Sequence, residues 1–144
     1  MKLSSLILIA AVVLVTAPPA VFLYMNRIVN PRVADELRNE PNGERARKVM
    51  LLTLPSGREI PVNYLREGAS IYAAADGRWW RELIGDGASV RLLVRGKPLA
   101  GHARAIRNDP AQTKTIFARL RPNALPGFGT LVEVQLNTFS TLSE

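Results

Sequence analysis

The chain has 144 residues, enough for one domain with an appendage, and its 19 Lys and Arg against 12 Asp and Glu give a formal net charge of +7. It contains no cysteine and a single histidine, which excludes disulfides, thiol catalysis, iron–sulfur clusters and multi-histidine metal sites. We therefore predict no bound metal. The positive charge suits a phosphate-bearing ligand, an anionic lipid surface or nucleic acid, and equally a solvated surface.

Residues 3–25 contain no charged side chain and follow the basic start Met1-Lys2. The run is long enough to cross a membrane as a helix, which takes about 20 residues, and Tyr24 and Arg27 suit its interfacial end. A cleaved signal peptide is the alternative, but cutting after Ala17 would place a proline at the new N-terminus. We expect residues 1–27 to be an uncleaved transmembrane anchor or signal-anchor, which would hold the protein in the membrane through residues 3–25.

A polar segment over residues 28–44 follows the apolar run and is predicted to be a linker. Asn30-Pro31 and Pro41-Asn42-Gly43 bracket it, leaving room for a helical turn or two between them. Basic residues gather at this end of the apolar run, and the positive-inside rule then favours a single-pass protein with its C-terminal domain in the cytoplasm. These residues are Arg27, Arg32, Arg38, Arg45, Arg47 and Lys48.

Residues 45–144 have the pattern of a mainly β domain. Apolar or alternating runs bounded by Gly- and Pro-containing turns predict strands, and two short segments have helical composition. The predicted strands cover residues 49–54, 60–66, 70–75, 90–94, 99–106 and 130–136. One predicted helix runs from Arg78 to Ile84, and the other has Asp109 as its N-cap, Pro110 at its first position and Pro122 beyond its end.

Six mostly antiparallel strands and two short helices cannot cover both faces of an open sheet in a domain of this size. Closing the sheet into a small barrel removes its edges and buries the apolar runs. We therefore predict a six-stranded split or partly open β-barrel, preceded by the N-terminal transmembrane helix.

Three short motifs stand out as candidate sites. Ser56-Gly57-Arg58 and Asp76-Gly77-Arg78 each combine a glycine turn with an arginine, an arrangement that suits an anion, although turns need glycine in any case. Trp79-Trp80 could place one ring in the core and the other in a groove, or both in the core or at a membrane interface. No nucleophile–base–acid set is present, so the catalytic residues are unknown, and we expect a structural role for His102.

Several stretches resemble the deazaflavin-dependent nitroreductase family, whose members are split barrels related to the pyridoxamine-phosphate-oxidase and flavin-reductase barrels. Val49 to Thr53 with the following 56–64 segment is similar to the family's first hairpin, and Ile71 to Gly77 is similar to the end of its third strand. Trp80-Arg81-Glu82-Leu83 is similar to its short helix, and Gly101-His102-Ala103-Arg104 to part of its next hairpin. The resemblance spans about residues 45–137.

This resemblance implies a cofactor site. Ser56, Gly57 and Arg58 would hold the cofactor's phosphate, and Pro61 and Val62 would line its ring. Ala74, Ala75 and Asp76 would meet the ring edge, and Trp80 would close the pocket. The implied cofactor is the deazaflavin coenzyme F-420, with flavin mononucleotide (FMN) as the alternative. Homodimerisation is also expected from the family.

Our leading hypothesis is therefore a deazaflavin- or flavin-dependent oxidoreductase of the nitroreductase type, which transfers hydride to a small organic acceptor. The alternative is a non-catalytic, membrane-tethered barrel that binds a cofactor, a lipid or a protein partner. The shortened turn Leu54-Pro55-Ser56-Gly57, which lacks the Gly-Arg-Lys part of the family's motif, favours that alternative. Nucleic acid is not expected, since aromatic residues make up only 6% of the chain.

Overall fold

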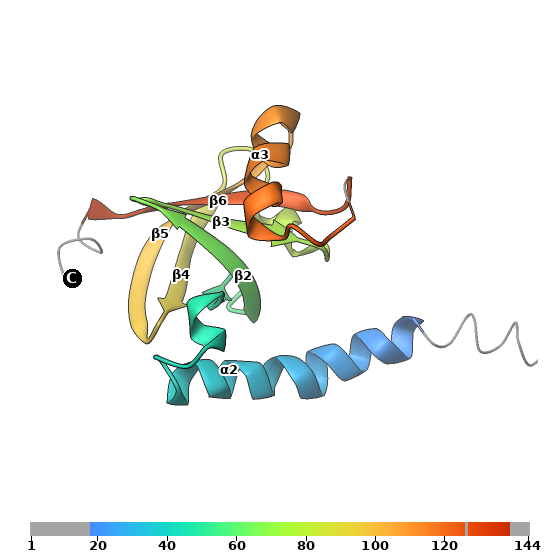
Figure 1. Cartoon of the computed structure of the whole chain (residues 1–144), viewed down its shortest axis with the longest axis vertical. Helices are drawn as coiled ribbons and strands as arrows, with labels where there is room; N and C mark the ends of the chain where they lie inside the picture. The colour runs from blue at the N-terminus through green and yellow to red at the C-terminus, as the bar shows by residue number, and fades with distance from the viewer. Residues whose placement is uncertain (1–17, 126, 139–144) are drawn as a thin grey trace, which may run out of the picture.

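The computed structural model of the chain describes residues 18–125 and 127–138, and its centre is a closed β-barrel (Figure 1). Around the barrel the strands follow the order β1-β2-β3-β6-β5-β4, and all neighbouring strands are antiparallel. The strands are β1 (Val49–Thr53), β2 (Glu59–Glu67), β3 (Ser70–Ala75), β4 (Ala88–Val94), β5 (Lys97–Ile106) and β6 (Thr130–Leu136). The predicted mainly β, six-stranded barrel is confirmed, but it is closed and not partly open, because β4 pairs with β1 to complete the ring.

Two tight turns set the register of the barrel. Glu67 pairs with Ser70 across the β2–β3 turn, where Gly68 has a φ of +60°. In the β4–β5 turn both Arg95 and Gly96 have positive φ, as the two central residues of a type I′ turn require. Because side chains alternate between the faces of a strand, these fixed registers decide which residues enter the barrel.

The inside of the barrel is filled by apolar side chains from all six strands and by Leu83 from the segment between β3 and β4. Met50, Leu52, Ile71 and Val134 are among its fully buried members. On β5 a side chain at Gly101 would place its Cβ 2.5 Å from the carbonyl oxygen of Gln135, so only glycine allows β5 and β6 to approach this closely.

A helix leads into the barrel from the N-terminal side. Residues 18–24 are helical, a π-helical turn η1 (Met25–Val29) follows, and α2 (Asn30–Asn39) then runs beneath the barrel in Figure 1. Ala34 and Leu37 of α2 pack on Ala46 and on Leu51 of β1. Most of the segment predicted as a linker, residues 28–44, is therefore an ordered helix fixed to the barrel by its apolar face.

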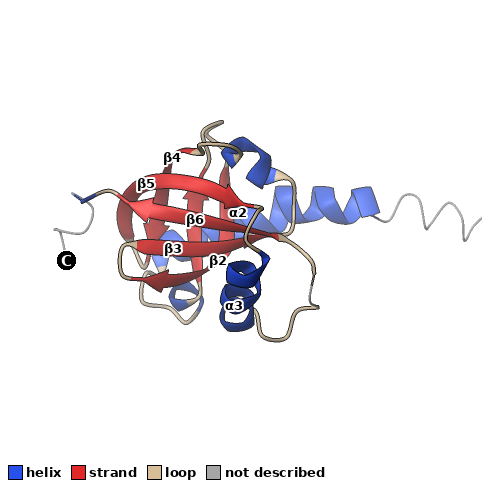
Figure 2. Cartoon of the chain, turned by 90° about the horizontal axis from the view of Figure 1, so that it is seen from above, coloured by secondary structure: helices blue, strands red, loops and turns tan. Residues whose placement is uncertain are grey.

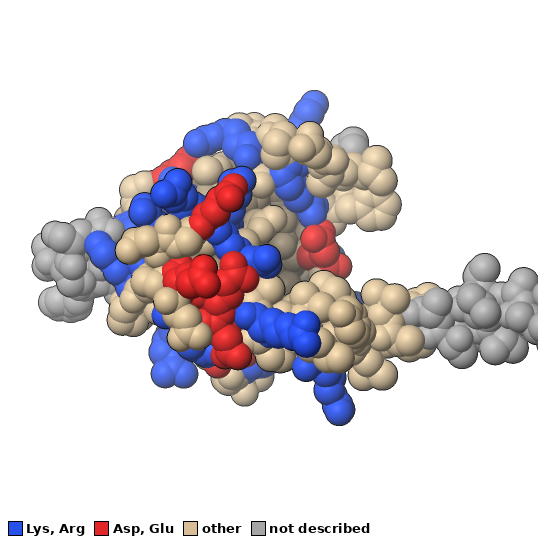
Figure 3. All heavy atoms as spheres, turned by 60° about the horizontal axis from the view of Figure 1, so that its bottom comes forward, with Lys and Arg blue, Asp and Glu red and all other residues tan. Residues whose placement is uncertain are grey.

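Two ion pairs lie beside the contact between α2 and the barrel. Arg38 of α2 lies 2.5 Å from Glu59 of β2, and Glu36 lies 3.0 Å from Arg45 of the 3-10 turn η2 (Arg45–Arg47). Figure 3 shows this face, where acidic side chains gather with basic ones beside them. These four side chains are all more than a third exposed, so the pairs contribute little to stability and mainly orient α2.

The two helices predicted between strands are present. The first is the 3-10 helix η3 (Trp79–Leu83), and the second is α3 (Pro110–Leu120), whose N-cap Asp109 accepts a hydrogen bond from the backbone N–H of Gln112. Ile116 of α3 packs against the outside of the barrel, on Tyr72 and Leu131. Figure 2 shows α3 beside β2 and β3 at one end of the barrel.

In the described part of the chain, no helix has both the length and the apolar character needed to span a membrane. Residues 3–17 of the predicted anchor lie outside the described residues. The transmembrane anchor and the cytoplasmic placement of the barrel therefore stay predictions.

Candidate functional site

A small hollow lies where the end of β3 meets β2 and the end of α3, and we call it the β2–β3 hollow. Its volume is about 280 Å³. Four of the residues predicted to surround a cofactor ring line it: Pro61, Val62, Ala74 and Asp76. The fold adds Asn63, Gly77, Trp79, Leu120 and Arg121 to the lining. Strand pairing between β2 and β3 thus brings together four residues that were predicted from separate motifs.

Arg121 is the best-anchored charged side chain of this region, with only 14% of its side chain exposed. Its guanidinium lies 2.5 Å from the carboxylate of Asp76 and donates a second hydrogen bond to the carbonyl oxygen of Phe128. It also lies 4.3 Å from the centre of the Phe117 ring. Arg121 therefore ties the end of β3, the helix α3 and the loop over residues 121–129 to one another.

A second and larger space, which we call the α3 cavity, lies between α3 and the loop that connects α3 to β6. Its volume is about 710 Å³, within the usual range for small-molecule sites, and Arg121 lines it as well as the β2–β3 hollow. Its apolar wall includes Phe117, Leu125 and Phe128, and two further cations, Arg107 and Lys114, line it.

Arg107 and Lys114 differ from most arginines and lysines that line hollows of this barrel. Both are exposed, and in the described part of the chain neither forms an ion pair with a carboxylate. Arg107 stacks over the ring of Trp80, 4.8 Å from its centre, which leaves its N–H groups free to meet an anion. The α3 cavity thus combines aromatic walls with the positive charges of Arg107 and Lys114, which no carboxylate among the described residues neutralises.

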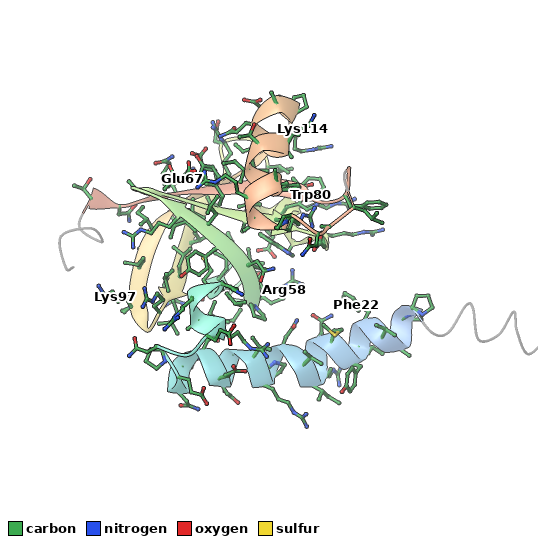
Figure 4. The ribbon with its side chains drawn as sticks, in the orientation of Figure 1. Phe22, Arg58, Glu67, Trp80, Lys97 and Lys114 are labelled. Atoms are coloured by element: carbon green, nitrogen blue, oxygen red, sulfur yellow. The ribbon has the colours of Figure 1, made fainter. Side chains whose placement is uncertain are left out.

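The structure does not bring the predicted phosphate turn into this region. Ser56 donates hydrogen bonds from its backbone N–H and its hydroxyl to the carboxylate of Glu82, at 3.1 and 3.0 Å, and Arg58 lies 3.9 Å from the same carboxylate. Glu82 thus occupies the position where an anion was expected. In Figure 4, Arg58 lies on the side of the barrel that faces α2, whereas Trp80 and Lys114 lie on the side of α3.

Two further predicted residues have other positions. Ala75 is 1% exposed and belongs to the barrel core, because successive strand residues point to opposite faces and Ala74 takes the outer one. Trp80 packs partly buried beside the core and does not line the β2–β3 hollow, whereas Trp79 does. Consecutive residues of a 3-10 helix point about 120° apart, so the sequence pair did not reveal which ring would face the hollow.

Three further polar side chains, His102, Tyr72 and Tyr64, have structural surroundings. His102 Nε2 lies 2.5 Å from the carbonyl oxygen of Asp86, which fixes the loop before β4. Burial raises the pKa of Tyr72 above its ordinary value of 10.0, and the neighbouring carboxylate of Glu133 raises this pKa further. Burial likewise raises the pKa of Tyr64. No cluster of metal-ligating side chains occurs within residues 18–125 and 127–138.

Sequence reasoning missed Arg121, Arg107 and Lys114. The available signal was the loop after α3, where Gly127 and Gly129 flank the exposed aromatic Phe128, a pattern that is unusual for a plain connection. The convergence of this loop with β3 depends on the pairing of β3 with β6, which no local pattern reveals.

Among the comparisons with known proteins, the comparison with solved structures gives matches. No protein-family model matches the chain, and no curated protein matches it. Among solved structures it is similar to one from Listeria innocua, provisionally named a pyridoxamine 5′-phosphate oxidase, with a TM-score of 0.50 and 12% identity over 74% of this chain and 92% of that one. The chain therefore shares the barrel fold of that protein.

Two other similar structures have lower TM-scores. The General Stress Protein 26 of Bacillus anthracis has a TM-score of 0.45 and 15% identity, over 73% of this chain and 89% of that one. The FAD binding protein of Mycobacterium smegmatis has a TM-score of 0.41 and 15% identity, over 72% of this chain and 85% of that one. At such identities a likeness concerns the fold alone and does not distinguish a deazaflavin from a flavin.

Proposed function

We propose that this split barrel binds a flavin-type cofactor and that the α3 cavity is its site. The observation that carries the proposal is the pairing of aromatic walls with two cations, Arg107 and Lys114, that have no protein carboxylate as partner in the described residues. A flavin nucleotide has a flat aromatic ring system and an anionic phosphate, so its two parts match these two features. The likeness of the fold to the Listeria innocua protein named after a pyridoxamine-phosphate oxidase supports a cofactor of this general type.

The residues that line the α3 cavity match the two parts of a flavin-type cofactor. Arg107 and Lys114 would hold the phosphate, and Phe117 would flank the ring system. The β2–β3 hollow, at about 280 Å³, is too small to take a whole flavin nucleotide, and Arg121 is the one lining residue that it shares with the α3 cavity. A bound flavin or deazaflavin would supply hydride-transfer chemistry, and the chain's own residues would position it and exclude water.

The finer version of this proposal is a deazaflavin-dependent oxidoreductase of the nitroreductase type acting on a small organic acceptor. It rests on the sequence resemblance over residues 45–137. It differs from a flavin mononucleotide enzyme in the cofactor alone, so separate titrations with the two cofactors distinguish them.

A second candidate is a barrel that binds a ligand or a partner without catalysis. The carboxylate of Glu82 favours it, because Glu82 takes the hydrogen bonds of the Ser56 turn that would otherwise meet a phosphate. This candidate predicts that the purified chain carries no chromophore and binds neither cofactor.

The test is an absorption spectrum of the purified full chain, followed by titration with flavin mononucleotide and with the deazaflavin coenzyme. Lys114→Gln removes one charge from the α3 cavity, and Arg58→Gln removes one charge from the predicted phosphate turn as its matched control. We expect Lys114→Gln to weaken binding about 10- to 100-fold, the usual effect of losing one charge-assisted hydrogen bond, and Arg58→Gln to leave it within about twofold.

Two results would contradict this. A loss of affinity in Arg58→Gln with none in Lys114→Gln would return the phosphate to the Ser56 turn. No binding of either cofactor to the unmutated chain would favour the non-catalytic barrel.

A further inference from the structure

Two segments far apart in sequence expose large apolar side chains at the same end of the molecule. On the N-terminal helix Val21, Phe22, Leu23 and Tyr24 are each more than half exposed. On the loop between α3 and β6, Leu125 is 74% exposed and Phe128 is 65% exposed. Figures 1 and 2 agree that this loop lies at the end of the barrel toward which residues 18–29 extend, away from the β2–β3 turn.

The apolar part of the helix has no polar side. Consecutive helical residues point about 100° apart, so the four exposed residues 21–24 surround the helix axis. A helix that is apolar all round belongs in a protein core or in a membrane, and no described residue of the chain covers this one. The uncharged sequence continues upstream through residues 3–17.

The loop is held in place. Arg121 donates a hydrogen bond to the carbonyl oxygen of Phe128, and Gly129 lies against the same guanidinium. Phe128 is therefore presented to solvent by a loop tied to α3 and β3. An aromatic ring displayed in this way has a large contact area, and the anchored backbone beneath it has little conformational entropy left to lose on docking.

We propose that helix residues 21–25 and the loop side chains Leu125 and Phe128 together form one membrane-docking end, with the loop entering the headgroup region of the lipid bilayer. This rests on the predicted membrane association of residues 3–25. A bilayer is the occupant that suits both segments, because the charge-free run upstream is long enough for lipid and Arg27 follows the apolar helix residues at the place where headgroups would lie. Leu125 and Phe128 also line the α3 cavity, so this docking would bring the cavity to the bilayer surface.

Because the chain contains no cysteine, a single introduced cysteine gives one labelling site. The test places a spin label on Phe128→Cys, on Leu125→Cys or on Ala69→Cys of the full chain, reconstituted with vesicles of phosphatidylcholine and phosphatidylglycerol. Ala69 is exposed in the β2–β3 turn at the opposite end of the barrel and is the matched control. Collision with molecular oxygen reports contact with lipid, and collision with a water-soluble nickel complex reports contact with water.

We expect the labels at residues 125 and 128 to gain oxygen accessibility and to lose nickel accessibility when vesicles are added, while the label at residue 69 stays accessible to nickel. Labels at 125 and 128 that stay as accessible to nickel as the label at 69 would overturn the proposal. Protection that appears without vesicles and increases with protein concentration would overturn it in favour of a second copy of the chain. Cofactor titration of the same chain is a separate measurement, so failure of the flavin proposal remains distinguishable.

Discussion

Replacing Gly129 by alanine tests whether Arg121 holds the loop that forms the α3 cavity. Gly129 has a φ of +89°, and an added Cβ would lie 2.5 Å from Nη2 of Arg121. Because Nη2 is the far end of a flexible side chain, the arginine can move aside, but it then loses its hydrogen bonds to Phe128 and Asp76. Gly127→Ala is the matched control, since Gly127 has a φ of +86° and its Cβ would meet nothing within 4 Å.

The expected loss of stability follows from these contacts. Both alanines adopt a left-handed backbone, which costs about 1–2 kcal/mol and is partly offset by about 0.4–1 kcal/mol from the stiffer unfolded chain. Gly127→Ala should therefore lower the free energy of unfolding by about 1 kcal/mol. Gly129→Ala should also lose the charged hydrogen bond to the Phe128 carbonyl, worth about 1.5–3 kcal/mol. The ion pair with Asp76 adds at most about 1 kcal/mol, because the Asp76 side chain is 73% exposed.

The assay is urea unfolding of the full chain followed by tryptophan fluorescence, with both substitutions also made in an Arg121→Ala background. In that background no guanidinium meets the new Cβ, so we expect Gly129→Ala to cost no more than Gly127→Ala. Equal losses for the two substitutions in the unmutated background would refute the reasoning, because Arg121 would then not be constrained by Gly129.

Two further predictions concern the supports of the site. Leu37→Ala should lower the free energy of unfolding by about 2–4 kcal/mol, because Leu37 is 3% exposed where α2 packs on the barrel. Arg32→Ala, on the exposed side of α2, is the control and should change this free energy by about 0.5 kcal/mol or less. Equal effects of the two substitutions in calorimetry would argue against a packed helix. Burial raises the pKa of Tyr72 above 10.0 in the folded state, which means that folding favours the neutral phenol. The contribution of Tyr72 to the stability of the fold is therefore complete below pH 10 and is lost as the pH rises through the folded-state pKa. Tyr72→Phe should therefore flatten the fall of stability above pH 10 in pH-dependent unfolding, and an unchanged slope would contradict this assignment.

Much of the barrel was predictable from local patterns. The Gly-containing turns, the strand predicted at residues 130–136 and the Asp109 cap each depend on residues close together in sequence, and all of them are confirmed. Of the predicted site residues, Pro61, Val62, Ala74 and Asp76 share one hollow because β2 and β3 form a simple hairpin whose register a two-residue turn sets.

The positions of the charged groups were decided only by the tertiary structure. Glu82 reaches Ser56 across 26 residues of chain, and Arg121 reaches Asp76 across 45. The orientation of α2 likewise depends on its contact with β1, because a short polar helix has no stable position without packing. Sequence alone determined the strands, the turns and the charge-free N-terminal run, since these follow from neighbouring residues. Which arginine is neutralised and which faces a cavity depends on closing the barrel, and that closure brings distant segments within hydrogen-bonding distance.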